Sequence, residues 1–207
     1  MTSAAAPPGT IVQFLFDVVS PYSYLAAMRI EDVVARARPE ATIAWRPVLL
    51  GGITKALASK TPLDVPHKAR YMARDLADWA AYFQVPFRYP RRFPTSTLLA
   101  QRVLTAAAPA DRAALAKALF AAYWGAGEDV ADQAVVVAAI VGAGHDPAPL
   151  MAAAETQAIK DALRAETDDA VRRGAFGVPT MFVGDHMFWG QDRLELLAWH
   201  LERLRAP

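Results

Sequence analysis

Three short motifs contain residue types that could bind or activate a small ligand. Ser20-Pro-Tyr-Ser23 follows an apolar run and precedes a helical pattern. Gly177-Val-Pro-Thr180 stands directly before another apolar run, and Trp189-Gly-Gln-Asp-Arg193 stands directly before the last helical pattern. Each motif is a turn next to a regular element, and such turns often carry the binding residues of a protein.

Ser20 has two interpretations. A serine at this position can cap the following helix, because its oxygen accepts a hydrogen bond from an otherwise unpaired amide. The amides and the positive end of the same helix also stabilise an anion, including a thiolate. Position alone favours the cap and leaves the anion site open.

Each of the other two motifs also has two interpretations. Pro179 either only marks the start of a strand or is the site of a cis bond that exposes backbone groups. We predict a cis bond, because Val178 and Pro179 would lie opposite the Ser20 turn, where a ligand backbone needs a free carbonyl and amide. Asp192 either starts a helix beside Arg193 or, together with the Gly190 and Gln191 amides, holds a zwitterionic ligand.

Composition excludes several classes of function. The chain has no cysteine, which excludes disulfides, thiolate nucleophiles and thiol–disulfide exchange. Its four histidines have no ligand-like spacing, so we predict no metal site. A net charge of +1 predicts no nucleic-acid partner. The apolar stretch 135–141 is too short to span a membrane and no secretory signal is recognisable, so we expect a cytoplasmic protein.

The pattern of elements frames the three motifs. Residues 11–17 read as a buried strand, 23–37 as a helix and 42–48 as a second strand, a short connection that favours a parallel pair. From residue 67 helical patterns follow until residue 173, including those opened by the capping residues Asp132 and Asp146. Residues 180–183 and 186–189 then flank Gly184-Asp185 as a hairpin, before a final helix over 194–204.

This order predicts an α/β domain with a βαβ…ββα sheet interrupted by a large all-helical insertion. We expect one domain over residues 10–207, with sheet parts at about 10–55 and 175–207 and the insertion at about 56–174. The three motifs then meet at one edge of the sheet.

Longer stretches resemble the 2-hydroxychromene-2-carboxylate isomerases and the related kappa-class glutathione transferases. The similarity runs in register from about residue 11 to about residue 200. It is carried by Phe16-Asp-Val-Val-Ser-Pro-Tyr-Ser-Tyr-Leu25, Arg46-Pro-Val-Leu-Leu-Gly-Gly-Ile53, Lys68-Ala-Arg-Tyr-Met72, Gly174-Ala-Phe-Gly-Val-Pro-Thr180 and Met187-Phe-Trp-Gly-Gln-Asp-Arg193. The last two stretches fit the isomerase branch.

The resemblance implies a thioredoxin-like fold and glutathione as cofactor. Ser20 would hydrogen-bond the glutathione sulfur and favour its thiolate. The backbone at Val178 and Pro179 would pair with the tripeptide. The segment Gly190-Gln191-Asp192 would hold the γ-glutamyl end, and Lys68 would face the glycine carboxylate.

Two further positions complete this pattern. Ser59 stands where the kappa-class pattern has an asparagine before the proline pair, so Ser59 would have to replace the contact made by the asparagine. A substrate carboxylate also needs a cation, and we select Arg92 over Arg88 and Arg91 in the same loop.

The resemblance implies conversion of 2-hydroxychromene-2-carboxylate, a small aromatic substrate, to trans-o-hydroxybenzylidenepyruvate by reversible thiolate addition. It also implies a homodimer. Two alternatives stay open: a kappa-type glutathione transferase or peroxidase acting on other electrophiles, and a glutathione-binding module without catalysis.

Overall fold

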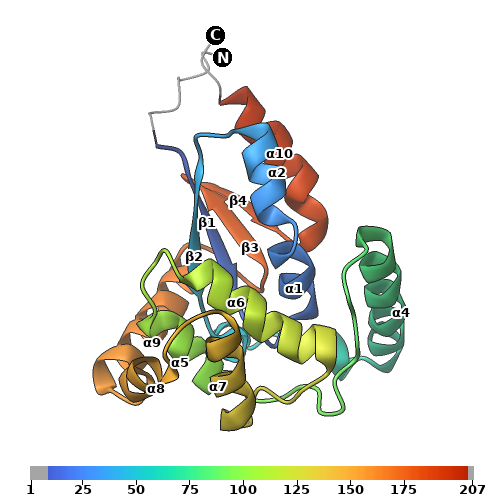
Figure 1. Ribbon diagram of the computed structural model, residues 1–207. Helices are drawn as coiled ribbons and strands as arrows, with labels where there is room; N and C mark the ends of the chain where they lie inside the picture. Colours follow the sequence, from blue (N-terminus) through green and yellow to red (C-terminus); the bar gives the residue numbers. More distant parts are fainter. Residues whose placement is uncertain (1–8, 205–207) are drawn as a thin grey trace.

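The computed structural model describes residues 9–204, and its centre is a four-stranded mixed sheet (Figure 1). The strand order is β2-β1-β3-β4. These strands are β1 (Ile11–Phe16), β2 (Thr42–Pro47), β3 (Thr180–Val183) and β4 (His186–Trp189). β1 pairs parallel with β2 and antiparallel with β3, and β3 pairs antiparallel with β4 across the Gly184-Asp185 turn. The predicted parallel pair and hairpin are both confirmed.

β1 is buried on both faces, as its nearly continuous apolar sequence predicts. Val12, Phe14 and Phe16 alternate onto one face and join the larger core cluster. Leu15 points to the other face and packs with Phe182 in a smaller cluster. The strand that leads to Ser20 is therefore anchored by packing on both of its faces.

Helices cover both faces (Figure 1). α1 (Pro21–Ala27), α2 (Ile30–Ala37) and α10 (Leu194–Arg203) contribute to the larger cluster, and α2 packs against α10. α3 (Leu50–Ala56) and α9 (Gln157–Arg172) supply Ile53 and Ala170 to the smaller cluster and pack against each other.

The middle of the chain is helical throughout. Within the described range, residues 57–179 contribute no strand, as predicted. Beyond α9 the segment contains the 3-10 turn η1 (Pro62–Asp64), α4 (Pro66–Phe83), α5 (Leu98–Ala106), α6 (Arg112–Phe120), the π-helical turn η2 (Ala121–Ala126), α7 (Gln133–Gly142) and α8 (Pro147–Ala154). The α/β, thioredoxin-like fold with a helical insertion is confirmed.

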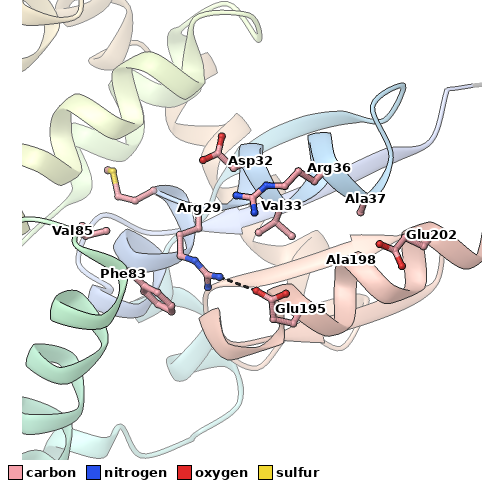
Figure 2. Close-up of a pocket in the computed structure, with 11 residues that line it drawn as sticks. Arg29, Asp32, Val33, Arg36, Ala37, Phe83, Val85, Glu195, Ala198 and Glu202 are labelled. Atoms are coloured by element: carbon pink, nitrogen blue, oxygen red, sulfur yellow. Dashed lines mark hydrogen bonds and ion pairs between the residues drawn. The ribbon is translucent and has the colours of Figure 1, made fainter.

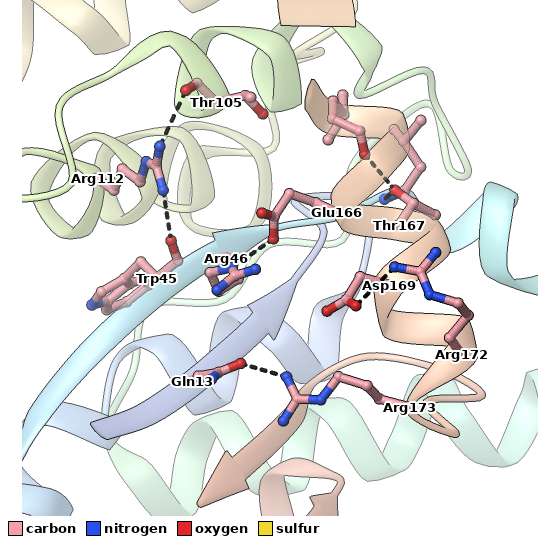
Figure 3. A network of polar contacts seen from close by, with 12 residues as sticks. Gln13, Trp45, Arg46, Thr105, Arg112, Glu166, Thr167, Asp169, Arg172 and Arg173 are labelled. Atoms are coloured by element: carbon pink, nitrogen blue, oxygen red, sulfur yellow. Dashed lines mark hydrogen bonds and ion pairs between the residues drawn. The ribbon is translucent and has the colours of Figure 1, made fainter. Parts of the chain in front are cut away.

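Polar contacts fix α6 and α9 to the sheet (Figure 3). Arg46 of β2 pairs with Glu166 of α9 at 2.5 Å between Nε and Oε2. Arg173, just beyond α9, donates to Gln13 Oε1 of β1 at 2.5 Å. Arg112 of α6 donates to the carbonyl of Trp45 at 3.5 Å. The insertion is thus bonded to the strands as well as packed on them.

Two helical assignments from the sequence were wrong. The single helix expected over 23–37 is two helices, because Arg29 leaves the helical path to lie over the Phe83 ring at 3.9 Å and to pair with Glu195 at 2.8 Å. α3 was not predicted, and its Gly51 and Gly52 disfavour a helix. At Gly52 a Cβ would lie 2.9 Å from Thr167 Cγ2, so this glycine permits the close approach of α9.

No helix within residues 9–204 is both long enough and apolar enough to cross a membrane.

Candidate functional site

Ser20 lies between the end of β1 and the first turn of α1, and it is buried. Its Oγ accepts a hydrogen bond from the Ser23 amide at 3.1 Å, so the cap interpretation is confirmed. The same hydroxyl donates its hydrogen to the carbonyl of Val178 at 3.2 Å, across 158 residues of sequence. Ser20 therefore caps α1 and also faces the second motif.

The second motif adopts the predicted geometry. The peptide bond between Val178 and Pro179 is cis. The carbonyl of Pro179 accepts a hydrogen bond from the Gly190 amide at 3.0 Å, which joins the second motif to the third. Among the described residues, the Val178 amide hydrogen makes no hydrogen bond. A donor is therefore free beside the Ser20 hydroxyl.

The third motif places one buried and one exposed side chain. Gln191 is buried, and its Oε1 has no hydrogen-bond partner within residues 9–204. Asp192 is exposed and pairs with Arg193 at 2.8 Å. Gly190 has φ of 110°, a conformation that strains any residue with a Cβ, so this position favours glycine. A buried amide oxygen without a partner is free to accept a hydrogen bond from a ligand.

Lys68 lies on α4, a helix that is bonded to α1 by Tyr22 and Asp75. Tyr22 donates to Asp75 Oδ2 at 2.8 Å, and Tyr71 donates to Oδ1 of the same carboxylate at 3.3 Å. Burial, and then the hydrogen bond to Asp75, raise the pKa of Tyr22. Lys68 lies on α4 two turns before Asp75, is exposed, and forms no ion pair with any residue of the described range.

Ser59 and Arg92 are not joined to these groups by any hydrogen bond or ion pair within the described chain. Ser59 is exposed just after α3, and its amide donates to the Thr54 carbonyl at 3.0 Å. Arg92 is largely exposed and pairs with Asp129 at 3.3 Å. Arg88 donates to the Ala126 carbonyl at 3.4 Å, whereas Arg91 has no such contact among residues 9–204.

Sequence reasoning missed the buried polar residues beneath Ser20. Asp17 accepts hydrogen bonds from Thr97 Oγ1 at 2.6 Å, Leu50 N at 2.9 Å and Val19 N at 3.1 Å. Burial raises the pKa of this carboxyl, and the three hydrogen bonds oppose that shift. The only sequence signal is a charged residue at the end of an otherwise apolar strand.

An exposed aromatic pair borders the second and third motifs. The rings of Phe176 and Trp189 lie 4.7 Å apart, and both side chains are exposed. At Gly177 a Cβ would lie 2.8 Å from Trp189 Nε1, so the absence of a side chain lets the indole lie against the turn.

A recess of about 370 Å³ lies elsewhere, between α2, α10 and the end of α4 (Figure 2). The Arg29–Glu195 ion pair spans it, beside Phe83. None of the three motifs lines this recess, so we do not assign it to the Ser20 site.

Comparison with known proteins agrees with this geometry. The model of the DSBA-like thioredoxin domain family matches residues 11–202, which is nearly the whole chain. The chain belongs to this family.

Within the family, the chain is similar to two groups of enzymes. It is 32% identical to a 2-hydroxychromene-2-carboxylate isomerase of Sphingobium xenophagum, over 92% of this chain and 97% of that one. It is 31% identical to glutathione S-transferase kappa 1 of Rattus norvegicus, over 97% of this chain and 95% of that one. The resemblance read from the sequence motifs is confirmed.

Solved structures give the same result. A 2-hydroxychromene-2-carboxylate isomerase structure superposes with a TM-score of 0.84 at 30% identity, covering 94% of this chain and 95% of that one. A probable DsbA oxidoreductase of Streptomyces coelicolor superposes at 0.76 with 22% identity, over 96% of this chain and 92% of that one, and this shows the shared fold alone. This DSBA-like chain has a serine at the strand-to-helix turn and no cysteine.

Proposed function

We propose that this protein is a glutathione-dependent isomerase that converts 2-hydroxychromene-2-carboxylate to trans-o-hydroxybenzylidenepyruvate. The observation that carries the proposal is the Ser20 hydroxyl, held 3.2 Å from the carbonyl of Val178 beside the cis-proline. The similarity to named isomerases over almost the whole chain supports it.

The polar groups of the second and third motifs, together with Lys68, fit the parts of glutathione. A peptide backbone needs a donor and an acceptor, which the free Val178 amide and its carbonyl offer. An ammonium group needs acceptors, which the unpartnered Gln191 Oε1 and the Asp192 carboxylate supply. A carboxylate needs a cation, which Lys68 supplies from α4. The residues present therefore match a zwitterionic tripeptide.

When bound, glutathione would supply a thiol that can add reversibly to a conjugated carbon, so that the former double bond can rotate. A free thiol of pKa ~8.5 is mostly protonated at neutral pH, so the protein must favour the thiolate. Ser20 has a single hydroxyl hydrogen, now donated to Val178. Turning that hydrogen toward a sulfur is the contribution we assign to Ser20.

The substrate carboxylate would be met by a cation of the 86–94 loop. We keep Arg92 in this role, with its Asp129 partner released or shared when the substrate binds. Ser59 stays a proposed replacement for the kappa-class asparagine, since its hydroxyl makes no hydrogen bond within the described residues. We further propose that the enzyme works as a homodimer in the cytoplasm, where glutathione is the ordinary soluble thiol.

Turnover of the chromene tests the proposal directly. The absorbance change should require glutathione in the wild type. Ser20→Ala should lower kcat by about 10²-fold, the cost of removing one donor to a reacting anion, with little change in glutathione affinity. Ser23→Ala is a matched control, because the Ser23 hydroxyl is buried in the same turn and lacks a partner. Equal wild-type activity without glutathione, or an unimpaired Ser20→Ala, would refute the proposal.

The comparisons favour the kappa-type transferase as a second candidate, because the rat kappa protein is nearly as similar as the isomerases. Conjugation of glutathione to 1-chloro-2,4-dinitrobenzene separates the two. An isomerase should turn over the chromene and conjugate this electrophile poorly, whereas the reverse preference indicates a transferase.

A further inference from the structure

The four residues that precede Ser20 are held from outside the sheet. They connect the end of β1 to the cap of α1, and the backbone carbonyls of Phe16, Asp17 and Val18 all accept hydrogen bonds. Only the Asp17 carbonyl is satisfied within the turn, by the Ser20 amide at 2.9 Å. The side-chain donors to this segment all belong to the helical insertion.

Gln101 of α5 joins the ends of two strands. Its Nε2 donates to the Phe16 carbonyl at 2.9 Å and to the Val48 carbonyl at 2.7 Å. Gln101 has no exposed surface. The Phe16 carbonyl also accepts from the Val48 amide at 3.0 Å, so the two Gln101 bonds add to a direct backbone bond between the ends of β1 and β2 in a buried place.

Thr97 holds the Asp17 carboxylate. It stands at the N-cap position of α5, where a threonine oxygen ordinarily caps its own helix. Here the side chain makes no cap bond and donates to Asp17 Oδ1 at 2.6 Å instead. The same carboxylate accepts from the Val19 amide, one residue before Ser20, at 3.1 Å. Thr97 is therefore oriented toward the Ser20 turn and not toward its own helix.

Trp124 is the third side chain of the insertion that bonds to this segment. It belongs to the π-helical turn η2, and its Nε1 donates to the Val18 carbonyl at 2.8 Å. Phe87 stacks on its ring at a centroid distance of 6.0 Å, and Phe93 meets it edge-on at 5.2 Å. The indole cannot easily rotate away from the turn, since it is fully buried in this aromatic cluster.

We propose that Thr97, Gln101 and Trp124 are positioning residues of the Ser20 site, through which the helical insertion sets the place of the Ser20 hydroxyl. Their effect on turnover rests on the proposed function, whereas their effect on the geometry of the turn does not. A displacement of about 1 Å in a reacting group can lower a rate about 10²-fold, so the positions held by these bonds matter for catalysis.

The test compares two threonines of the same region. Thr97→Val removes the hydroxyl that holds Asp17 and leaves the volume nearly unchanged. Thr105→Val is the matched control, because the Thr105 hydroxyl is also buried but donates only to the Gln101 carbonyl within α5, at 2.8 Å. Thr97→Ser should restore the wild-type behaviour, since it keeps the hydroxyl. Trp124→Phe is a second variant that removes the indole donor and keeps a ring.

Two readouts are needed. The first is hydrogen exchange of the Ser20 and Ser23 amides, measured by NMR on the full chain without ligand, because these amides bond to Asp17 and to Ser20 Oγ. We expect exchange about tenfold faster in Thr97→Val and Trp124→Phe, and unchanged in Thr105→Val. The second is turnover of the chromene, where kcat should fall at least about tenfold while KM and glutathione affinity stay within about twofold.

The outcomes separate the two proposals. A wild type that is inactive toward the chromene with glutathione contradicts the proposed function, and the amide exchange then decides the positioning claim alone. Unchanged exchange in Thr97→Val and Trp124→Phe overturns that claim. An equal fall of kcat in Thr97→Val and Thr105→Val, in proportion to their losses of stability, also overturns the positioning claim.

Discussion

At the scale of single residues, the proposed function requires the Ser20 hydroxyl to change its hydrogen-bond partner when glutathione binds. Its one hydrogen goes to Val178 at 3.2 Å, which is long for a hydroxyl-to-carbonyl bond. A long bond is readily exchanged for one to a ligand atom. In the same proposal Gln191 Oε1 would gain a partner, which would remove the cost of leaving it unpaired in a buried position.

Asp192 gives a first prediction. If its carboxylate holds the ammonium of glutathione, Asp192→Ala should weaken binding about tenfold or more, since a hydrogen bond to a charged group contributes about 1.5–3 kcal/mol. Glu195→Ala is the control, because Glu195 is also an exposed carboxylate paired with an arginine at 2.8 Å. An exposed pair contributes about 0–1 kcal/mol. Calorimetry that finds the two variants equal would leave Asp192 as a helix-start residue.

Gly177 gives a second prediction. A methyl group at this position would lie 2.8 Å from Trp189 Nε1, so Gly177→Ala must displace the indole. We expect a shift in Trp189 fluorescence and weaker glutathione binding, because Val178 is the next residue. Gly142→Ala is the control, since a Cβ there meets no atom within 4 Å. Unchanged fluorescence and affinity in Gly177→Ala would show that the turn does not depend on this contact.

The motif residues and their supporting residues differ in how far the sequence reveals them. Ser20, the cis bond at Pro179 and the Gly190 turn could be anticipated, because each lies in a short local pattern. Thr97 and Trp124 could not, since their bonds to Asp17 and Val18 span 80 and 106 residues of sequence. No local pattern specifies such a partner.

At the scale of elements, the strands were easier to predict than the helix boundaries. Short strand-like runs and the Gly184-Asp185 turn are local signals, and they predicted β3 and β4 correctly. The break between α1 and α2 depends on Phe83 and Glu195, which are distant in sequence. α3 forms against its propensity because α9 packs closely on Gly52.

The contact between β4 and α10 predicts that the free energy of unfolding depends on pH. The rings of His186 and His200 lie 4.4 Å apart, and burial and then the charge of His186 lower the pKa of His200 below 6.5. The unfolded chain therefore binds a proton more readily than the folded chain. The contribution of His200 to the free energy of unfolding should be constant above pH 6.5. The free energy of unfolding should then fall as the pH drops below 6.5.

Denaturant unfolding at pH 7.5 and pH 5.5 measures this change in the free energy of unfolding. His200→Phe keeps an aromatic ring against His186 and removes the titrating group, so part of the loss at low pH should disappear. The same loss in wild type and His200→Phe would assign it to other groups.

At the scale of the whole molecule, the insertion and the sheet share one core. The larger cluster contains Phe14 and Phe16 of β1 together with Leu104 of α5 and Phe120 of α6. The rings of Phe16 and Phe120 lie 5.8 Å apart. The insertion therefore cannot separate from the sheet without exposing β1, the strand that leads to Ser20.

Phe120→Ala tests this coupling. It should lower the free energy of unfolding by about 3–5 kcal/mol, the cost of removing a buried aromatic ring. Unfolding followed by far-ultraviolet circular dichroism and by tryptophan fluorescence should give one coincident transition in wild type and variant. Two separate transitions would show that the insertion and the sheet unfold independently.

The measurement that tests the central claim most directly is the pKa of the glutathione thiol in the bound state, followed by the ultraviolet absorbance of its thiolate. In the wild type the pKa should lie below the free value of ~8.5, because the Ser20 hydroxyl stabilises the charged form. In Ser20→Ala it should return toward that value, while Ser23→Ala should behave as wild type. A bound thiol with the same pKa in wild type and Ser20→Ala would contradict the role that we assign to Ser20.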